Sequence, residues 1–294
     1  MAKTAQRSPK TRDWYALRRK KRRRRRVRRG LFLASFVILA AALVVVAPHT
    51  GVLPAAEEDT GPRHALTPLA EPARSDKPVI AVDPGHGGTD PGTEGSGIRE
   101  SEMTWRTANA LANLLEEDGR FSPLLTISES ESQDSTQPRV EPAERTRRAA
   151  DAGAVLFFSI HGDADGDAST CGFECYAIPP GRSDHQASLS LARLVARGFG
   201  DAGARVRGED GVRYIYFDAA DNRMVFESSD ESIHTDPTFR ILETAPCPAV
   251  LAEQCFLTNA ADAEAFASAD GCQTAAQIYY NAICAWWDQQ AAEP

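Results

Sequence analysis

Several residue types are missing from long stretches of this chain of 294 residues. The first 170 residues contain no cysteine, residues 1–30 contain a single acidic residue, Asp13, and residues 31–47 contain no charged residue. The chain also shows no internal repeat. These absences exclude a disulfide in the N-terminal half, a repeat architecture and an even spread of charge. The chain therefore consists of segments suited to different surroundings.

Charge separates the N-terminus from the rest of the chain. Residues 1–30 carry 15 lysines and arginines against one acid, a net charge of +14. The other 18 basic and 40 acidic residues give residues 31–294 a net charge of −22, and the whole chain −8. A basic run such as residues 18–29 can bind nucleic acid. An apolar segment follows it directly, so a DNA-binding membrane protein is a remote alternative and we expect no nucleic-acid partner.

The apolar segment, residues 31–47, predicts a transmembrane anchor. Its 17 residues lie at the short limit for a helix that crosses the hydrocarbon core. Lysines and arginines on one flank mark the cytoplasmic side, so we expect residues 1–30 to be a basic cytoplasmic tail. The alternative is a cleaved signal, because Arg28-Arg29 looks somewhat like a twin-arginine export signal, although Pro48 makes a poor cleavage site. With either an anchor or a cleaved signal, the rest of the chain is expected to lie outside the cytoplasm.

Cysteine usage agrees with export. An even number of cysteines in an exported domain predicts disulfides. Buried free thiols are the alternative, because cysteine packs well as a small apolar side chain. The spacing of the first two cysteines fits neither a CxxC zinc site nor a redox pair. The six are Cys171, Cys175, Cys247, Cys255, Cys272 and Cys284.

Residues 48–77 are rich in proline and polar residues and predict a linker, too polar to bury a core. Residues 78–289 alternate strand and helix patterns, which predicts a single α/β domain with a mostly parallel sheet flanked by helices. Residues 128–138 are expected to be an exposed loop. The expected strands are 79–82, 124–127, 154–160, 173–178, 212–217 and 250–252, and the expected helices are 100–117, 141–151, 187–202 and 274–287.

Three chemically active side chains follow predicted strands. His86 lies in the glycine-rich loop after residues 79–82, His161 follows residues 154–160, and Glu253 follows residues 250–252. The carboxyl ends of parallel strands share one edge of a sheet, where ligands bind. Each residue alone also has a structural explanation: a hydrogen-bonded turn histidine, or a glutamate that caps a helix or pairs with arginine. Their common placement favours a site.

Glu100 opens the first predicted helix, and the glycine-rich loop can fold it back to the same edge. Glu94 and Glu102 compete for this place. Two imidazoles and one carboxylate suit a catalytic zinc that keeps a fourth position open. The spare carboxylate, Glu253, would then be the general base.

The residues around these positions resemble those of a known protein family. Residues 79–287 resemble the zinc-dependent N-acetylmuramoyl-L-alanine amidases, which cut bacterial peptidoglycan. The resemblance rests on three ordered blocks with Glu100 between the first two: Val79 to Gly92, which contains Asp83-Pro84-Gly85-His86-Gly87-Gly88; Ala154 to His161; and Pro248 to Glu253, followed by Phe256-Leu257-Thr258-Asn259.

The resemblance implies roles for the individual residues. His86, Glu100 and His161 would bind one Zn²⁺, and Glu253 would assist catalysis as the general base. The substrate would be the amide between N-acetylmuramic acid and L-alanine, and the setting cell-wall remodelling or lysis. The location would be the bacterial cell membrane, single-pass with the catalytic domain outside, or the medium if the N-terminal segment is a cleaved signal.

The chain departs from the family pattern in three places. Gln254-Cys255 replace a small residue and glycine, and Cys255 is a candidate partner of Cys247. Gly162-Asp163 place an acid beside the site. Residues 217–236 look longer than the family needs. In some relatives an inserted segment here plugs the zinc site until a partner removes it, which leaves a protein activator as a candidate partner; an exposed acidic loop is the alternative.

Two other functions fit the same residues. A zinc peptidase that acts on wall stem peptides would use the same metal chemistry on a different bond. An inactive module that binds peptidoglycan or regulates a partner is the non-enzymatic alternative. All four chemical positions are filled, which favours an enzyme over that module.

Overall fold

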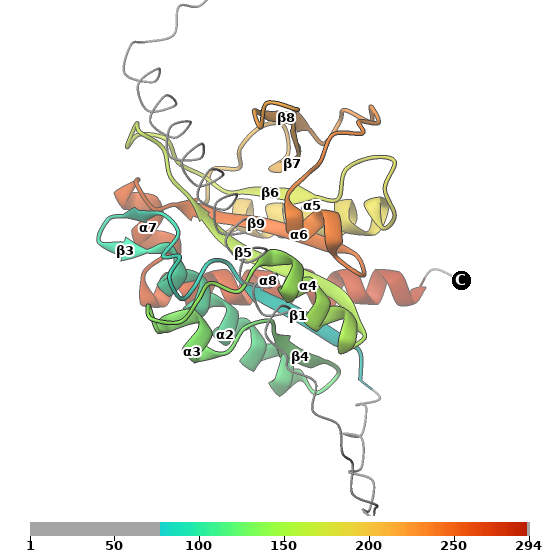
Figure 1. Cartoon of the computed structure of the whole chain (residues 1–294), viewed down its shortest axis with the longest axis horizontal. Coiled ribbons are helices and arrows are strands. Elements are labelled where there is room, and N and C mark those ends of the chain that lie inside the picture. The colour runs from blue at the N-terminus through green and yellow to red at the C-terminus, as the bar shows by residue number, and fades with distance from the viewer. Residues whose placement is uncertain (1–76, 293–294) are drawn as a thin grey trace, which may run out of the picture. The chain divides into compact units, whose positions relative to one another are not determined.

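The computed structural model describes residues 77–292 (Figure 1). The predicted cytoplasmic tail, anchor or signal and all but the last residue of the linker lie outside the described residues. Within residues 77–292, no helix combines the length and apolar character needed to cross a membrane.

A mixed sheet forms the centre of the domain, in the order β4-β1-β5-β9-β6-β7-β8. The first four of these strands are parallel neighbours, β6 runs antiparallel to β9, β7 is parallel to β6, and β8 is antiparallel to β7. Parallel pairs thus form the majority, as predicted. The strands are β1 (Val79–Pro84), β4 (Ser122–Leu125), β5 (Ala154–Asp163), β6 (Glu174–Ala177), β7 (Val212–Phe217), β8 (Arg223–Glu227) and β9 (Ala249–Phe256).

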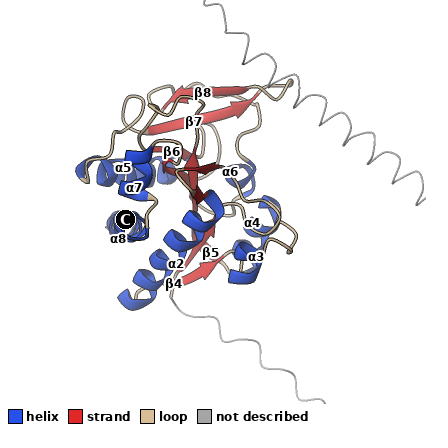
Figure 2. Ribbon diagram, turned by 90° about the vertical axis from the view of Figure 1, so that its left-hand side faces the viewer, coloured by secondary structure: helices blue, strands red, loops and turns tan. Residues whose placement is uncertain are grey.

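Helices cover both faces of this sheet. On one face α2, α5 and α8 pack together, and on the other α4 packs beside α6 (Figures 1 and 2). The predicted α/β domain is therefore confirmed as three layers. The helices are α2 (Glu100–Asp118), α3 (Glu129–Gln133), α4 (Pro142–Asp151), α5 (His185–Asp201), α6 (Arg240–Thr244), α7 (Ala260–Phe266) and α8 (Ala269–Ala292).

Local sequence explains the main elements. Residues 80–82 are completely buried, because both faces of β1 are covered and a central strand can be apolar throughout. Met103, Leu111 and Leu115 recur at helical spacing on the buried side of α2. Gly119 ends α2 with a left-handed backbone at φ 76°, as expected of a C-cap glycine.

Several short elements escaped the sequence patterns. The hairpin of β2 (Glu94–Gly95) and β3 (Ile98–Arg99) was not predicted, nor were β8, α6 and α7. The prediction of a loop over residues 128–138 is partly wrong, because it contains α3. Ser128 accepts the N–H of Glu131 and its own N–H donates to the Glu131 carboxylate, a capping box that holds this one helical turn.

The predicted disulfides are wrong, since all six cysteines are free. Cys247 packs with Phe157 and Leu251 on the face of the sheet covered by α4 and α6. Cys255 belongs to the core on the opposite face, with Cys175 and Cys272. The sheet therefore separates Cys247 from Cys255, and the thiols pack as small apolar groups.

Residues 217–236 extend the sheet at its edge. Strand β8 pairs with β7, and Ser228 beyond it donates to Asp210 at 2.8 Å. Arg182 donates to the carbonyl of Asp236 at 2.7 Å, and Ile233 is 71% exposed. These contacts are those of a surface segment, and they give the plug alternative no support.

Candidate metal centre

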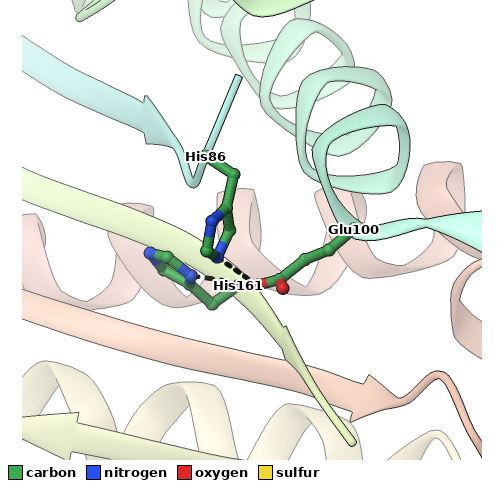
Figure 3. Close-up of side chains that lie close together, drawn as sticks. All are labelled: His86, Glu100 and His161. Carbon is green, nitrogen blue, oxygen red and sulfur yellow. Dashed lines mark hydrogen bonds and ion pairs between the residues drawn. The ribbon is translucent and has the colours of Figure 1, made fainter. Parts of the chain in front are cut away.

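Three side chains from separate elements converge at the carboxyl edge of the sheet. His86 Nε2 and His161 Nδ1 each lie 3.0 Å from Oε1 of Glu100. One ligand atom from each residue lies within 4.8 Å of the other two. Figure 3 shows both imidazoles pointing at the Glu100 carboxylate. The structure thus brings together the three residues that the sequence nominates as metal ligands.

The register of the sheet brings the histidines together. Strands β1 and β5 are parallel neighbours, with Pro84 opposite Ile160, so His86 and His161 leave the sheet at the same level. A Cβ on Gly85 would collide with the His161 ring, which is why only glycine fits between them.

The loop after His86 brings the chain back to the carboxyl edge of the sheet, where His86 and His161 lie. Glu100 donates its N–H to the carbonyl of Thr93 at 2.9 Å, and its Oε2 accepts the N–H of Thr93 at 2.8 Å. Gly92, at φ 74°, lies so close that a Cβ there would be 2.5 Å from that Oε2. The glycine-rich loop therefore folds Glu100 back, as predicted.

The structure also separates Glu100 from its two competitors. Glu94 is exposed in β2, and Glu102 forms an ion pair with Arg99 at the surface. Glu100 is buried and accepts the N–H of Gly162 at 3.1 Å as well as its contacts with the histidines.

The electrostatics of the site favour a cation. Burial alone would lower the pKa of His86, yet Asp90 and Glu100 raise that pKa to about 10. Burial alone would raise the pKa of Glu100, but the two histidines outweigh it and lower that pKa well below its usual value. The negative charge that favours the protonated imidazole would also favour a metal cation bound in its place.

Glu253 lies next to this centre. It occupies the β9 position opposite His161 in the parallel register, so both side chains leave the same face of the sheet. Its Oε2 atom is buried without a hydrogen-bond partner. Burial raises the pKa of Glu253 well above its usual value, and the nearby carboxylates of Asp163 and Glu100 add to this.

Sequence reasoning missed two acids at the site. Asp90 Oδ2 lies 3.1 Å from His86 Nδ1, and Arg139 donates to the same oxygen at 2.9 Å. Its only local signal is its place four residues after His86. Glu174 faces Glu253 directly across the antiparallel β6–β9 pair, and this signal appears only once the strand order is known.

Comparison with known proteins gives a consistent result. Residues 80–285 match the model of the N-acetylmuramoyl-L-alanine amidase family. The amidase CwlM of Bacillus licheniformis is 30% identical over 207 residues, which cover 69% of this chain and 66% of CwlM, just under two thirds of that relative.

Solved structures share the fold of residues 77–292. The catalytic domain of the amidase CwlV from Bacillus (Paenibacillus) polymyxa superposes with a TM-score of 0.55 at 25% identity, covering 72% of this chain and 98% of CwlV. The CwlD amidase of Clostridioides difficile, solved in complex with the GerS lipoprotein, has a TM-score of 0.53 at 20% identity, covering 72% of this chain and 100% of CwlD. With the family match over more than half of its length, this chain belongs to the N-acetylmuramoyl-L-alanine amidase family.

Proposed function

We propose that this protein hydrolyses the amide bond between N-acetylmuramic acid and L-alanine in peptidoglycan. The observation that supports this best is the convergence of His86, Glu100 and His161 beside Glu253 at one edge of the sheet. Membership of the amidase family agrees with it.

The donor set fits a single zinc ion. His86 Nε2, His161 Nδ1 and the buried Glu100 carboxylate are the nitrogen and oxygen ligands that catalytic zinc takes, with one position left for the reactants. A zinc ion held there supplies Lewis-acid chemistry, which polarises a carbonyl group and makes water more acidic. The carboxylates of Asp90 and Glu100, which raise the pKa of His86, also favour a cation beside this imidazole.

Glu253 is the base in this proposal. Its buried Oε2 has no protein partner, so it is available to a water molecule or to the substrate. A carboxylate with a raised pKa accepts the proton of the attacking water more readily. The same group then returns that proton to the leaving nitrogen of L-alanine. Glu253 thus acts first as the base and then as the acid, and no second proton donor is needed.

The partners follow from the substrate. The catalytic domain would act on peptidoglycan outside the membrane, reached from an anchor at residues 31–47 or after secretion. The CwlD amidase is described in complex with the GerS lipoprotein, and we extend to this chain the idea of a protein activator.

Digestion of purified peptidoglycan by the full chain tests this function. We expect mass spectrometry to show stem peptides with a free N-terminal alanine, and a chelator to abolish their release. Glu253→Gln should lower the rate by roughly 10²–10⁴-fold with zinc content unchanged, since general acid–base catalysis is worth about that much. The control is Glu264→Gln, an exposed residue of α7.

Other outcomes identify the alternatives. Cleavage within the stem peptide would indicate a zinc peptidase instead. A purified protein without zinc and without any cleavage would indicate a binding or regulatory module. Cleavage unaffected by a chelator would contradict the metal assignment.

A further inference from the structure

A buried guanidinium lies against the loop that carries His86. Arg145 of α4 is 3% exposed. Its Nη1 donates to the Asp83 carboxylate at 3.0 Å and to the carbonyl of Pro84 at 2.5 Å, and its Nη2 donates to the carbonyl of His86. Its Nε donates to the carbonyl of Val140 at 3.0 Å. Two of these four bonds thus go to backbone carbonyls of the loop, one at His86 itself and one at Pro84.

The partner of Arg145 is itself held by two neighbouring elements. Asp83 is the residue before the end of β1 and is 1% exposed. Its Oδ1 accepts the hydroxyl of Thr126, just beyond β4, and its Oδ2 accepts the hydroxyl of Ser159 in β5 at 2.7 Å. Through Asp83, the ion pair therefore links α4 to β1, to β5 and to the residue that follows β4.

The backbone of His86 needs this support. Its φ of 64° lies in the left-handed region, which a residue with a side chain occupies only when its surroundings over-determine it. On one side Arg145 holds the carbonyls of Pro84 and His86. On the other side Gly85 donates its N–H to the carbonyl of Ile160 at 2.9 Å. Held in this way, the imidazole points at Glu100 and His161 (Figure 3).

We propose that Arg145, paired with Asp83, is a positioning residue of the metal centre. It fixes the backbone at His86 so that, before a metal binds, Nε2 already lies 3.0 Å from Oε1 of Glu100, the oxygen that His161 also contacts. The inference rests on the proposed function, because it takes His86 to be a metal ligand. A purely structural ion pair would stabilise the domain with or without metal, whereas a positioning pair changes the affinity for metal itself.

The test is the zinc affinity of the full chain carrying Arg145→Lys. Lysine keeps the charge, but a single ammonium group cannot reproduce the planar set of bonds to Asp83, Pro84 and His86. We expect zinc to bind about 10–100-fold more weakly, as is usual when the support of a metal ligand is lost. Competition with a chromophoric chelator measures the affinity, and circular dichroism of the metal-free protein reports the fold.

A second readout separates positioning from stability. Zinc should raise the Tm of the wild-type protein, and this rise should be smaller in the variant at the same zinc concentration, even if the metal-free Tm values differ. Arg147→Lys is the matched control. Arg147 lies on the same helix but pairs only at the surface with Glu144 and Asp151. Its replacement by lysine should therefore leave the zinc affinity unchanged.

Each outcome decides the inference. Equal zinc affinity of wild type and a folded Arg145→Lys protein overturns the positioning role and leaves the proposed metal centre intact. If Arg145→Lys does not fold, Thr126→Val takes its place, since it removes one hydroxyl from Asp83 and should also weaken zinc binding. Wild-type protein that binds no zinc overturns the metal centre, and this inference with it.

Discussion

Asp90 illustrates how a single side chain can tune the proposed metal centre. Its carboxylate faces Nδ1 of His86, which leaves Nε2 as the atom directed at Glu100. Asp90 itself is held by Arg139, and the His86 contact lowers the pKa of Asp90 well below its usual value. A carboxylate in this position fixes the tautomer of a ligating imidazole and makes it a stronger donor.

Asp90→Asn should therefore weaken zinc binding by about 10–100-fold, because an amide keeps the shape but loses the charge. A chelator-competition titration gives the affinity. Glu141→Gln is the matched control, since Glu141 shares Arg139 with Asp90 through a contact of 2.8 Å and does not form the His86 contact. Unchanged affinity in Asp90→Asn would refute the role of this carboxylate.

Gly92 is a second residue whose substitution should affect the proposed metal centre. Alanine there would have a φ of 74° and a Cβ 2.5 Å from Glu100 Oε2. We expect Gly92→Ala to lower both the free energy of unfolding, by on the order of 1–3 kcal/mol, and the zinc affinity. Gly97→Ala has the same backbone strain at φ 75° with no atom within 4 Å of the new Cβ, so it should lower stability alone. Similar zinc affinities in the two variants would show that crowding at Glu100 is unimportant.

At the scale of elements, α3 depends on one carboxylate. Glu131 closes the capping box with Ser128 and pairs with Arg148 of α4 at 2.7 Å. The Arg148 hydrogen bond is the main cause that lowers the pKa of Glu131 from 4.5 to about 2. This one side chain therefore joins a short helix to the layer of α4.

The lowered pKa determines the direction of a pH effect. Because the folded protein favours the charged form, Glu131 stabilises it above pH 4.5, and this contribution is lost as the pH falls toward 2. Glu131→Gln should thus cost about 1 kcal/mol at neutral pH and almost nothing near pH 2. Thermal unfolding of both proteins across this pH range measures the difference. Glu129→Gln, an exposed residue of the same helix, is the control, and a pH-independent difference would disprove the linkage.

For the whole molecule, the six free thiols predict stability that does not depend on redox conditions. A reducing agent should leave the Tm unchanged. A thiol reagent should modify six cysteines in denaturant, but only the half-buried Cys171 and Cys284 readily in the native protein. Burial raises the pKa of Cys175 and Cys255, which further slows their reaction. Four or fewer reactive thiols in denaturant would reveal a disulfide.

The alternation of strands and helices and the order of the candidate site residues follow from the amino-acid sequence alone. Apolar runs, glycine loops and caps depend on neighbours within a few positions, so β1, α2 and β5 were predictable. His86, His161 and Glu253 could be placed near one edge because each follows a predicted strand, although His161 and Glu253 lie within the longer β5 and β9 of the structure.

Interactions between residues far apart in the chain became visible with the tertiary structure. It placed Glu100, rather than Glu94 or Glu102, beside the two histidines, because burial and the return of the loop are not visible in local sequence. It placed Cys247 and Cys255 on opposite faces, since strand order decides what lies across a sheet. It also brought Arg145 to Asp83 over 62 positions of sequence. Such contacts depend on how whole helices and strands pack together, and the pattern of neighbouring residues in the sequence does not determine that packing.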